Sequence, residues 1–425
     1  MDNVKEFFKH KLFSAANYVL VFIKWIFIAG IVGLICGLVG TAFDISVDKA
    51  SEVFQTHSWM IFLLLPAGLI IIGLYKLFKV QPHVGTNDII SSIRTSEKVP
   101  TLLVPLVFVG TVLTHLGGGS AGREGAALQI GGGIGQQMGR LLHLDEKDMH
   151  LITLCGMSGL FAALFGTPLT ATIFAIEVIS IGVVYYSALI PCLSASLAAF
   201  AVTRLFQVQA VKFELASIPE LDALMIAKVV IASGILAAIS ILFCAAMHGS
   251  HYLFKKYIKN DFLRSAIGAI AVIGLTLIFS DRRYNGTGMP IIKAAIEQGE
   301  ALPYDFVLKI LFTAITIGVG FRGGEMVPTF FIGATLGCTI GSFIGIDPGF
   351  AAAIGFIAMF CAVMNCPIAS IILSIEVFGA GGIIYFAVAA AVSYLLSGYY
   401  GLYSSQKIVY SKLKAEFVNM DTKSM

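Results

Sequence analysis

Long apolar runs constrain the fold of this chain more than any other feature of its sequence. The runs at residues 18–43, 59–75 and 223–254 are long enough to cross the hydrocarbon core of a bilayer. Hydrophobic residues make up 57% of the chain and charged residues only 12%, whereas about a quarter of a soluble domain is charged. Strands of a membrane barrel would alternate in polarity instead. The sequence therefore predicts an all-α, polytopic membrane protein.

Glycine and proline cut many of the apolar segments into short pieces. The breaks lie at residues 117–125, 131–135, 166–168 and 323–328. Non-helical backbone at membrane depth is tolerated only where it is packed in protein or lines a cavity. A helix that begins at such a break offers free N–H groups and the positive end of its dipole, which together attract an anion. We predict a bundle of tilted and broken helices with an anion pathway, although for 131–133 close helix packing is the favoured interpretation.

Two acidic residues occur inside this glycine-rich, apolar context. Glu124 lies in the sequence GREG at 122–125, and Glu325 lies in GGEMVP at 323–328. An ionised carboxylate within a membrane segment is costly, so such a residue is functional by default. We interpret Glu124 and Glu325 as parts of a transport pathway.

Four sequence landmarks recur in the same order in the two halves of the chain. The matched pairs are 85–90 with 286–292, Glu124 with Glu325, 130–135 with 332–337, and 166–178 with 365–377. This order predicts a single transmembrane domain over residues 1–425, made of one half at about 18–208 and another at about 220–415. The chain ends soon after its last predicted helix, so we expect no appended soluble regulatory domain.

The charges at segment ends predict that the two halves are inverted. The first long segment runs from a basic flank to an acidic one, whereas the segment that begins near Asp222 runs from an acidic flank to a basic one. Cytoplasmic flanks are enriched in lysine and arginine. Both termini are therefore predicted to be cytoplasmic, since lysines lie at the start and the end of the chain: Lys5, Lys9, Lys11 and Lys24, then Lys407, Lys412 and Lys414. Inverted repeats place a substrate near the bilayer midplane, where broken helices point their ends at it.

Several other functions are disfavoured by the sequence. The net charge of +3 is small and the lysines flank membrane segments, so no nucleic-acid partner is expected. The seven cysteines lack the spacing of a zinc site, and we expect neither a metal nor a cofactor. Ser120 in GGSAG formally fits a nucleophile motif, which leaves an intramembrane serine hydrolase as a remote alternative. A serine nucleophile also needs a base within reach, and the chain is not expected to be an enzyme.

The motifs above resemble those of the CLC family of anion channels and transporters, along nearly the whole chain. The gating segment of that family reads GREG, as at 122–125 here, and its two halves are inverted repeats. The resemblance implies a CLC-like helical bundle and a homodimer with one pathway in each subunit. It also implies that a tyrosine of the last helix lines the central anion site, and Tyr403 in GLYS at 401–404 is the best match.

Within this family, the chain is more similar to the fluoride-exporting bacterial branch than to the chloride branch. Thr86 replaces the serine that contacts chloride, and Glu325 stands in a segment that reads G-x-F-x-P in the chloride type. Val178 occupies the position where chloride exchangers carry an internal proton-handling glutamate. The resemblance therefore implies fluoride/proton antiport across the bacterial inner membrane, with a chloride channel or chloride/proton exchanger as the alternative.

The candidate site residues fall into two groups. Glu124 and Glu325 are predicted to gate the pathway and couple it to protons, and ionised Glu124 is expected to compete with the anion for its site. The expected anion-binding residues are Thr86, Asn87, Gly122, Arg123, Gly125, Met326, Val327 and Tyr403. Glu177 and Glu376, which end matching segments, are interpreted as structural groups that pair or cap. The expected partners are fluoride, with chloride as the alternative anion, protons and the lipid bilayer.

Overall fold

The computed structural model describes residues 2–82, 84–95 and 97–422, with side chains from residue 17 onward. The side chains of Lys5, Lys9 and Lys11 therefore lie outside the described part. The helices of the first half are α1 (Asp2–Thr56), η1 (Ser58–Leu63), α2 (Leu64–Leu77), α3 (Thr86–Thr95), α4 (Leu103–Leu116), α5 (Glu124–Leu141), α6 (Glu146–Phe165), α7 (Pro168–Glu177), η2 (Tyr186–Ala188) and α8 (Leu189–Leu205). Those of the second half are α9 (Ala223–Tyr257), α10 (Asp261–Phe279), α11 (Met289–Lys293), η3 (Ala294–Gln298), α12 (Asp305–Gly318), α13 (Met326–Ile344), α14 (Pro348–Met364), α15 (Pro367–Phe378) and α16 (Ile383–Leu396).

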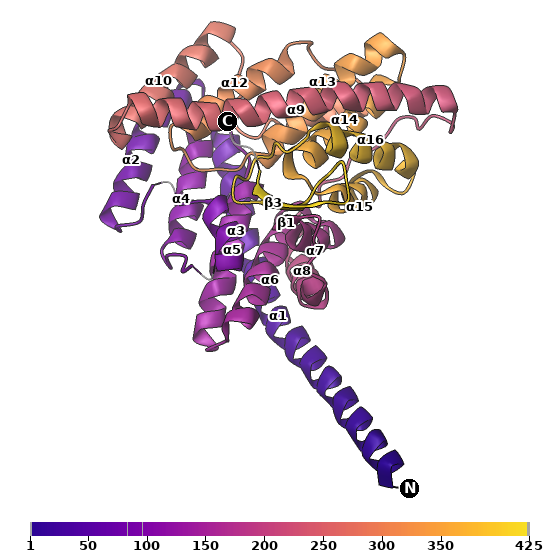
Figure 1. The fold of residues 1–425 in the computed structure, drawn as a ribbon. Helices are drawn as coiled ribbons and strands as arrows, with labels where there is room; N and C mark the ends of the chain where they lie inside the picture. Colours follow the sequence, from indigo (N-terminus) through magenta and orange to yellow (C-terminus); the bar gives the residue numbers. More distant parts are fainter. Residues whose placement is uncertain (1, 83, 96, 423–425) are drawn as a thin grey trace.

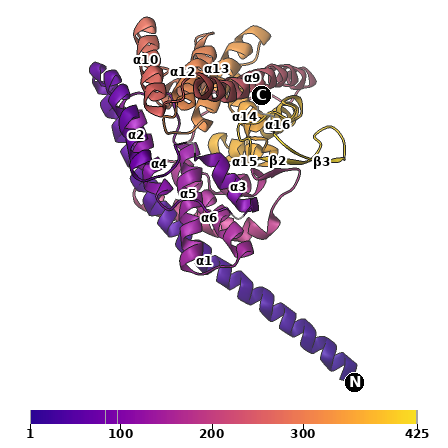
Figure 2. The same ribbon diagram turned by 60° about the vertical axis from the view of Figure 1, so that its left-hand side comes forward.

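The helices are tilted and of very unequal length, and the second half packs against the first in both ribbon views (Figures 1 and 2). Within the described residues, seven helical spans are long and apolar enough to cross a membrane. They are Asn17–Thr56, Ser58–Leu77, Glu146–Phe165, Tyr186–Leu205, Ala223–Tyr257, Asp261–Phe279 and Met326–Ile344. The apolar runs predicted from the sequence fall within these spans, and the helical membrane fold is confirmed.

Two helix breaks lie at corresponding positions of the halves. Gly166 ends α6 with a φ of 69°, and Asn365 ends α14 with a φ of 58°. A residue in this left-handed conformation closes a helix, and a proline in the next first turn starts another one. Pro168 and Pro367 begin α7 and α15 in this way.

The starts of α7 and α15 are capped by glutamates from the opposite half. Glu376 accepts hydrogen bonds from the backbone N–H groups of Leu169 at 3.0 Å and Thr170 at 2.8 Å. Glu177 accepts from the N–H groups of Ile368 at 3.2 Å and Ala369 at 2.9 Å. A carboxylate is favourable at a helix N-terminus because it pairs free N–H groups and opposes the dipole. The structural interpretation of both glutamates is confirmed.

Glycines bring helices into backbone contact in both halves. A Cβ atom added to Gly131 of α5 would lie 2.2 Å from the carbonyl oxygen of Gly156 in α6. The same holds between α13 and α14, where a Cβ on Gly333 would lie 2.3 Å from the oxygen of Gly355. The packing interpretation of the glycines at 131–133 is therefore confirmed for Gly131.

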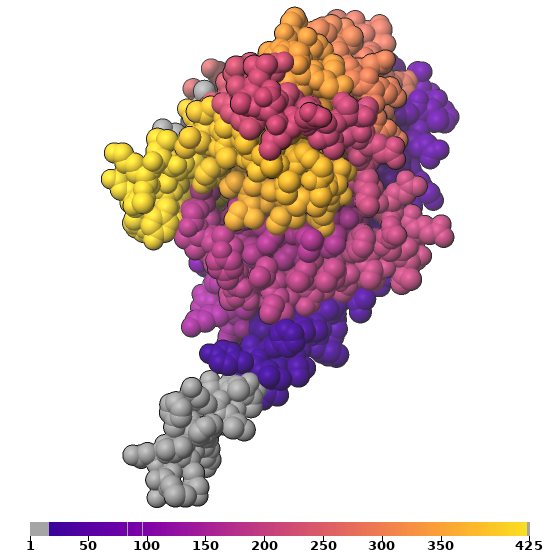
Figure 3. Space-filling view, turned by 90° about the vertical axis from the view of Figure 1, so that its right-hand side faces the viewer, coloured from indigo at the N-terminus to yellow at the C-terminus, as the bar shows by residue number. Residues whose placement is uncertain are grey.

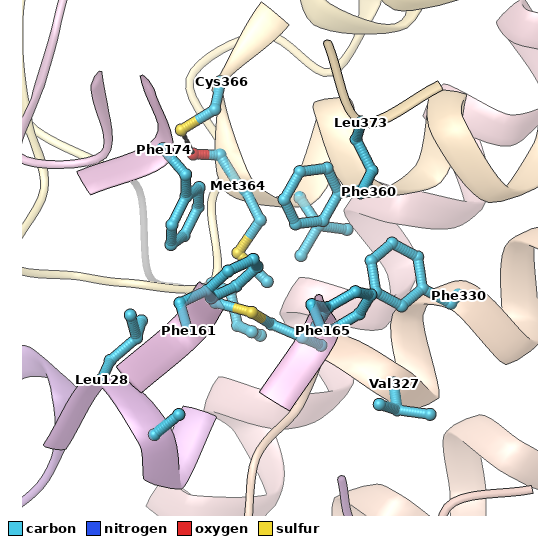
Figure 4. Packing of buried hydrophobic residues seen from close by; sticks show 14 of the residues in the cluster. Leu128, Phe161, Phe165, Phe174, Val327, Phe330, Phe360, Met364, Cys366 and Leu373 are labelled. Carbon is cyan, nitrogen blue, oxygen red and sulfur yellow. Dashed lines mark hydrogen bonds between the residues drawn. The ribbon is translucent and has the colours of Figure 1, made fainter. Parts of the chain in front are cut away.

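Aromatic side chains join the two halves in the buried core (Figure 4). Phe165 of the first half meets Phe330 of the second at 5.5 Å between ring centroids, and Phe174 meets Phe360 at 5.8 Å. Phe330 also stacks on Phe356 at 3.9 Å. Offset and edge-to-face contacts of this kind stabilise a core beyond its buried area.

A small sheet was not predicted from the sequence. Strand β2 (Lys407–Tyr410) pairs in parallel with β1 (Ser180–Ile181) and antiparallel with β3 (Phe417–Asp421). The C-terminal segment that carries β2 and β3 lies at one edge of the molecule (yellow in Figure 3). The prediction that Tyr403 belongs to the last helix is also wrong, because α16 ends at Leu396 and Tyr403 lies in the loop before β2. Gly398, with a φ of 59°, turns the chain away from the helix direction there.

Candidate functional site

The two glutamate-containing segments of the sequence lie side by side at the centre of the fold. The N–H of Gly122 donates to the carbonyl of Gly324, and the N–H of Gly324 donates to the carbonyl of Gly122, both at 2.7 Å. This isolated antiparallel bridge brings the starts of α5 and α13 together. A Cβ on Gly324 would lie 2.3 Å from the nitrogen of Gly125, so no side chain fits at position 324. Two sets of free helix N–H groups therefore converge on one region.

Glu124 is the first residue of α5 and is only 2% exposed. Its Oε2 accepts the backbone N–H of Arg123 at 3.0 Å, and its Oε1 lies 3.6 Å from the Nε of Arg123. A Cβ built on Gly122 would lie 3.0 Å both from Glu124 Oε2 and from the Cβ of Val327. The Glu124 carboxyl group thus lies beside the start of α13, which belongs to the other half.

Glu325, in turn, lies beside the start of α5, the helix that begins at Glu124. It occupies the position just before α13, and its Oε2 lies 3.2 Å from where a Cβ on Gly125 would be. The side chain is only partly buried. Met326 and Val327 follow it as the first residues of α13, with exposures of 0% and 1%. Each acid therefore lies against the helix start of the opposite half.

Arg123 is an anchor in this structure. Its Nη1 lies 2.5 Å from Asp44 Oδ1 and 2.7 Å from Asp48 Oδ1, and both aspartates belong to α1. Three carboxylates, including that of Glu124, therefore occupy the guanidinium. The sequence analysis used Asp44 and Asp48 only as flank charges, although their spacing of four residues in an apolar helix places them on one face.

Arg123, Asp44 and Asp48 also line a cavity of about 660 Å³. The loop that joins α8 to α9 and the residues around Thr287 and Lys293 form its other walls. Of the paired segments, this cavity is lined by Arg123, the residue just before Glu124.

Thr86 and Asn87 begin α3 and point to different neighbours. The Thr86 hydroxyl donates to the Gly125 carbonyl at 3.3 Å and accepts from Gln129 Nε2 at 3.1 Å. The Asn87 side-chain oxygen accepts the backbone N–H of Ser405 at 3.1 Å. The start of α3 therefore links α5 to the loop that carries Tyr403. Gln129 was not recognised from the sequence, since a lone glutamine in a glycine-rich helix gives no signal.

Tyr403 is 2% exposed, and its hydroxyl has no hydrogen-bond partner among the residues that the structure describes. The phenol lies within electrostatic range of both Glu325 and Glu124. Its backbone carbonyl accepts a hydrogen bond from Thr422 Oγ1 at 2.8 Å, next to β3. Leaving a buried hydroxyl unpaired costs free energy, so this O–H group is available as a donor to a ligand.

Lys309 of α12 is a second residue that the sequence analysis missed. It is fully buried, and its Nζ donates to the carbonyls of Tyr284 at 3.1 Å and Gly286 at 2.8 Å. The ammonium group also lies 5.2 Å from the centroid of the Phe331 ring. These contacts hold the lysine amino group in the interior, and only its lysine identity within an apolar run could have signalled it.

The groups that could support other chemistry are buried. The Ser120 hydroxyl lies 3.0 Å from Thr313 Oγ1, while His115 binds the Thr111 carbonyl through its Nδ1. The seven cysteines are buried and free. Within the described residues, no group of three or more histidine, cysteine, aspartate or glutamate side chains is arranged to hold a metal ion.

Comparison with known proteins gives consistent matches over most of the chain. The sequence pattern of a family described as voltage gated chloride channel matches residues 67–398. The chain is 36% identical over 396 residues to the "Chloride/fluoride channel protein" of Pseudomonas syringae pv. tomato, and the alignment covers 92% of this chain and 87% of that relative. It is 26% identical over 393 residues to the "H(+)/Cl(-) exchange transporter ClcA" of Vibrio vulnificus, covering 83% and 82% of the two chains.

Solved structures show the same likeness. A CLC-type fluoride/proton antiporter superposes with a TM-score of 0.87 at 31% sequence identity, covering 90% of this chain and 98% of that one. A slow cyanobacterial Cl⁻/H⁺ antiporter gives a TM-score of 0.75 at 19% identity, covering 88% and 94%. At this lower identity the likeness concerns the fold alone.

Proposed function

We propose a transport function for this chain from the premise that it belongs to the voltage-gated chloride channel family, the CLC family. The chain exports fluoride from a bacterial cytoplasm across the inner membrane in exchange for protons. Both termini are cytoplasmic, and the protein is a homodimer with one pathway in each subunit. Two findings support the exchange of fluoride for protons, namely the 36% identity with a chloride/fluoride channel protein and the TM-score of 0.87 with a fluoride/proton antiporter.

The observation that carries the proposal is the convergence of two acids and one unpaired phenol on the starts of α5 and α13. Ionised Glu124 accepts a backbone N–H at a helix start and competes with an anion for this region. Protonation of Glu124 removes its negative charge and weakens its attraction to the backbone N–H groups at the helix start. The carboxyl group then leaves the site to the anion. The Tyr403 hydroxyl then supplies a donor to the anion. Alternating occupancy by a proton and an anion produces exchange.

The choice of fluoride and the proton route rest on particular residues. Val178 is fully buried and apolar, so it cannot carry a proton at this position. Glu325 lies next to Gly125 at the start of α5 and is the remaining carboxyl group of the paired segments. We assign proton coupling to Glu325 together with Glu124. Thr86 places a hydroxyl beside the same helix start, where its proton is donated to the Gly125 carbonyl. In this proposal that proton turns to the anion, since a small and strongly hydrated anion needs donors to replace its water.

Efflux from proteoliposomes tests this proposal. Fluoride and chloride are followed with selective electrodes, while a pH-sensitive dye reports proton movement. Wild-type protein is expected to release fluoride and to drive protons in the opposite direction. Glu124→Gln is expected to keep a fluoride flux that no longer moves protons or depends on pH, because the amide cannot titrate. Glu416→Gln, at an exposed position of the C-terminal segment, serves as the matched control and is expected to behave as wild type.

A chloride channel or chloride/proton exchanger is the alternative, and the 26% identity with H(+)/Cl(-) exchange transporters favours it. Chloride flux equal to or above the fluoride flux would support this alternative. Fluoride flux without proton movement in the wild-type protein would indicate a channel. Unchanged proton coupling in Glu124→Gln would contradict the assigned role of Glu124.

A further inference from the structure

Two glutamines on α5 contact α3 in similar ways but differ in one respect. Gln136 is saturated, since its Nε2 donates to Ser92 Oγ at 2.8 Å while its Oε1 accepts the N–H of Val99 and Arg140 Nη2, each at 3.1 Å. Gln129 lies two turns nearer the paired segments and is 6% exposed. Its Nε2 is bound to Thr86, but its Oε1 is buried without a hydrogen-bond partner among the described residues.

The orientation of the Gln129 amide follows from its surroundings. Of the two terminal amide atoms of Gln129, the inner one contacts Thr86 Oγ1 and also lies 3.4 Å from the Gly125 carbonyl oxygen. The outer one is the unpaired atom. A carbonyl oxygen only accepts hydrogen bonds, so the inner atom must be the nitrogen. The outer atom is therefore an oxygen, which is an acceptor without a donor. An acceptor repels a bare anion, so the missing partner is a group that carries a proton.

The geometry points to Glu325 as that group. The Glu325 Oε2 lies 3.2 Å from the Cβ position of Gly125. Gln129 is four residues further along α5, and its side chain folds back over the turn of Gly125, as its contact with the Gly125 carbonyl shows. Both side chains therefore lie on the same turn of α5, one from each half of the protein.

We propose that Gln129 Oε1 accepts a hydrogen bond from the protonated carboxyl group of Glu325 and so holds the proton-loaded state of the transporter. The proton stays on Glu325, and the amide makes no covalent bond to it. When Glu325 loses the proton, two acceptors face each other and the carboxylate is driven from this position. Gln129 is thus a positioning residue for proton coupling, and this role rests on the proposed function.

Other charged and titratable groups face the same region. Glu124 and Arg123 lie at the start of α5, Tyr403 approaches from the C-terminal loop, and Asp88 of α3 accepts the N–H of Gly85 at 2.7 Å. Among these groups, Tyr403 is a competing donor because its hydroxyl is also unpaired. The test must therefore separate Glu325 from Tyr403.

Gln129→Met removes the acceptor at nearly the same side-chain length, and Gln136→Met is the matched control on the same helix. In proteoliposomes, Gln129→Met is expected to keep fluoride flux while the number of protons moved per fluoride falls by about two- to tenfold, the range that one hydrogen bond represents. The midpoint of the pH dependence is expected to move about one unit toward acid, because the proton-loaded state loses its partner. Gln136→Met is expected to keep both the ratio and the midpoint. Equal effects of the two substitutions would overturn the proposal.

Infrared difference spectra between acid and neutral pH give a second measurement that does not depend on transport. The carboxylic acid band that disappears in Glu325→Gln is expected to shift to higher frequency in Gln129→Met, since a hydrogen bond to the acid is lost. A band that does not shift would overturn the proposal. The proposal would also be overturned if Tyr403→Phe reproduced the effects of Gln129→Met and adding Gln129→Met to Tyr403→Phe had no further effect. Tyr403 would then be the donor to Gln129. If Gln129→Met does not fold, Gln129→Asn, whose amide is one methylene shorter, is compared in the same way.

The wild-type protein separates this inference from the proposed function. If wild type moves fluoride without protons, antiport is refuted, and the infrared band still decides whether Gln129 binds protonated Glu325. If wild type exchanges fluoride for protons and Gln129→Met keeps the wild-type ratio, antiport stands and the role of Gln129 is refuted.

Discussion

Replacing Gly324 by alanine is expected to damage the site, because the added methyl group meets backbone atoms of the opposite half. The new Cβ would lie 2.3 Å from the nitrogen of Gly125 and 2.8 Å from its Cα. These are backbone atoms at the start of α5, so no side-chain rotation relieves the contact. Bringing the shorter contact from 2.3 Å to 3.0 Å requires that the two helix starts separate by about 0.7 Å. The pair of 2.7 Å hydrogen bonds between Gly122 and Gly324 would then approach the length at which such bonds fail.

The size of the effect follows from these contacts. Overpacking a rigid core costs about 1–3 kcal/mol, and each weakened hydrogen bond contributes about 0.5–1.5 kcal/mol. The expected loss in the free energy of unfolding is about 2–6 kcal/mol. Transport is expected to fall as well, because the converging N–H groups of α5 and α13 move apart.

Thermal unfolding in detergent and fluoride efflux from proteoliposomes measure the two effects. Gly274→Ala in α10 is the matched control, since a Cβ there has nothing within 4 Å, and alanine favours a helix by about 1 kcal/mol over glycine. If Gly324→Ala melted and transported like Gly274→Ala, the close pairing of the two helix starts would be refuted.

Other substitutions test separate parts of the structure. Asp44→Asn is expected to lower stability by about 1.5–3 kcal/mol, because it removes a charged partner of Arg123 while Asp48 and Glu124 remain. Asp48→Asn, whose side chain is 66% exposed, is expected to cost less than about 1 kcal/mol. Equal melting temperatures of the two variants would contradict this. Glu376→Gln is expected to lower the melting temperature by weakening the cap on α7, at about 1–3 kcal/mol, and to leave ion selectivity unchanged in efflux assays. Tyr403→Phe is expected to weaken apparent fluoride affinity about tenfold or more without lowering the melting temperature, because its hydroxyl has no partner to lose; wild-type affinity would remove Tyr403 from the site.

Local patterns predicted those features that depend on neighbouring residues. The break at 166–168 was predicted from its glycine and proline, and α6 ends and α7 begins there. The repeat pairs this segment with 365–377, and α14 ends and α15 begins at the corresponding place. The capping interpretation of Glu177 and Glu376 was available because the two acids hold matching positions in a repeat. The residues that each one caps could not be named, since they belong to the opposite half of the chain.

In the candidate site too, the sequence identified residues but not the contacts that they make with distant segments. The sequence singled out Glu124, Glu325 and Tyr403, but it placed Tyr403 in a helix, whereas hydrogen bonds from Thr422 to Tyr403 and from Ser405 to Asn87 hold it in a loop. Such contacts join segments that are far apart in the chain, and no local preference encodes them.

The sequence by itself determined that this protein is a membrane bundle of broken helices, because the length of apolar runs and the backbone demands of glycine and proline act locally. It also determined the family, through the repeated motifs around Glu124 and Glu325. Only the tertiary structure decided which groups these acids meet, namely the Gly122–Gly324 bridge and the anchored Arg123. The same holds for the unpaired oxygen of Gln129. Whether a buried donor or acceptor is satisfied depends on the relative placement of distant segments, and packing of the whole fold alone sets that placement.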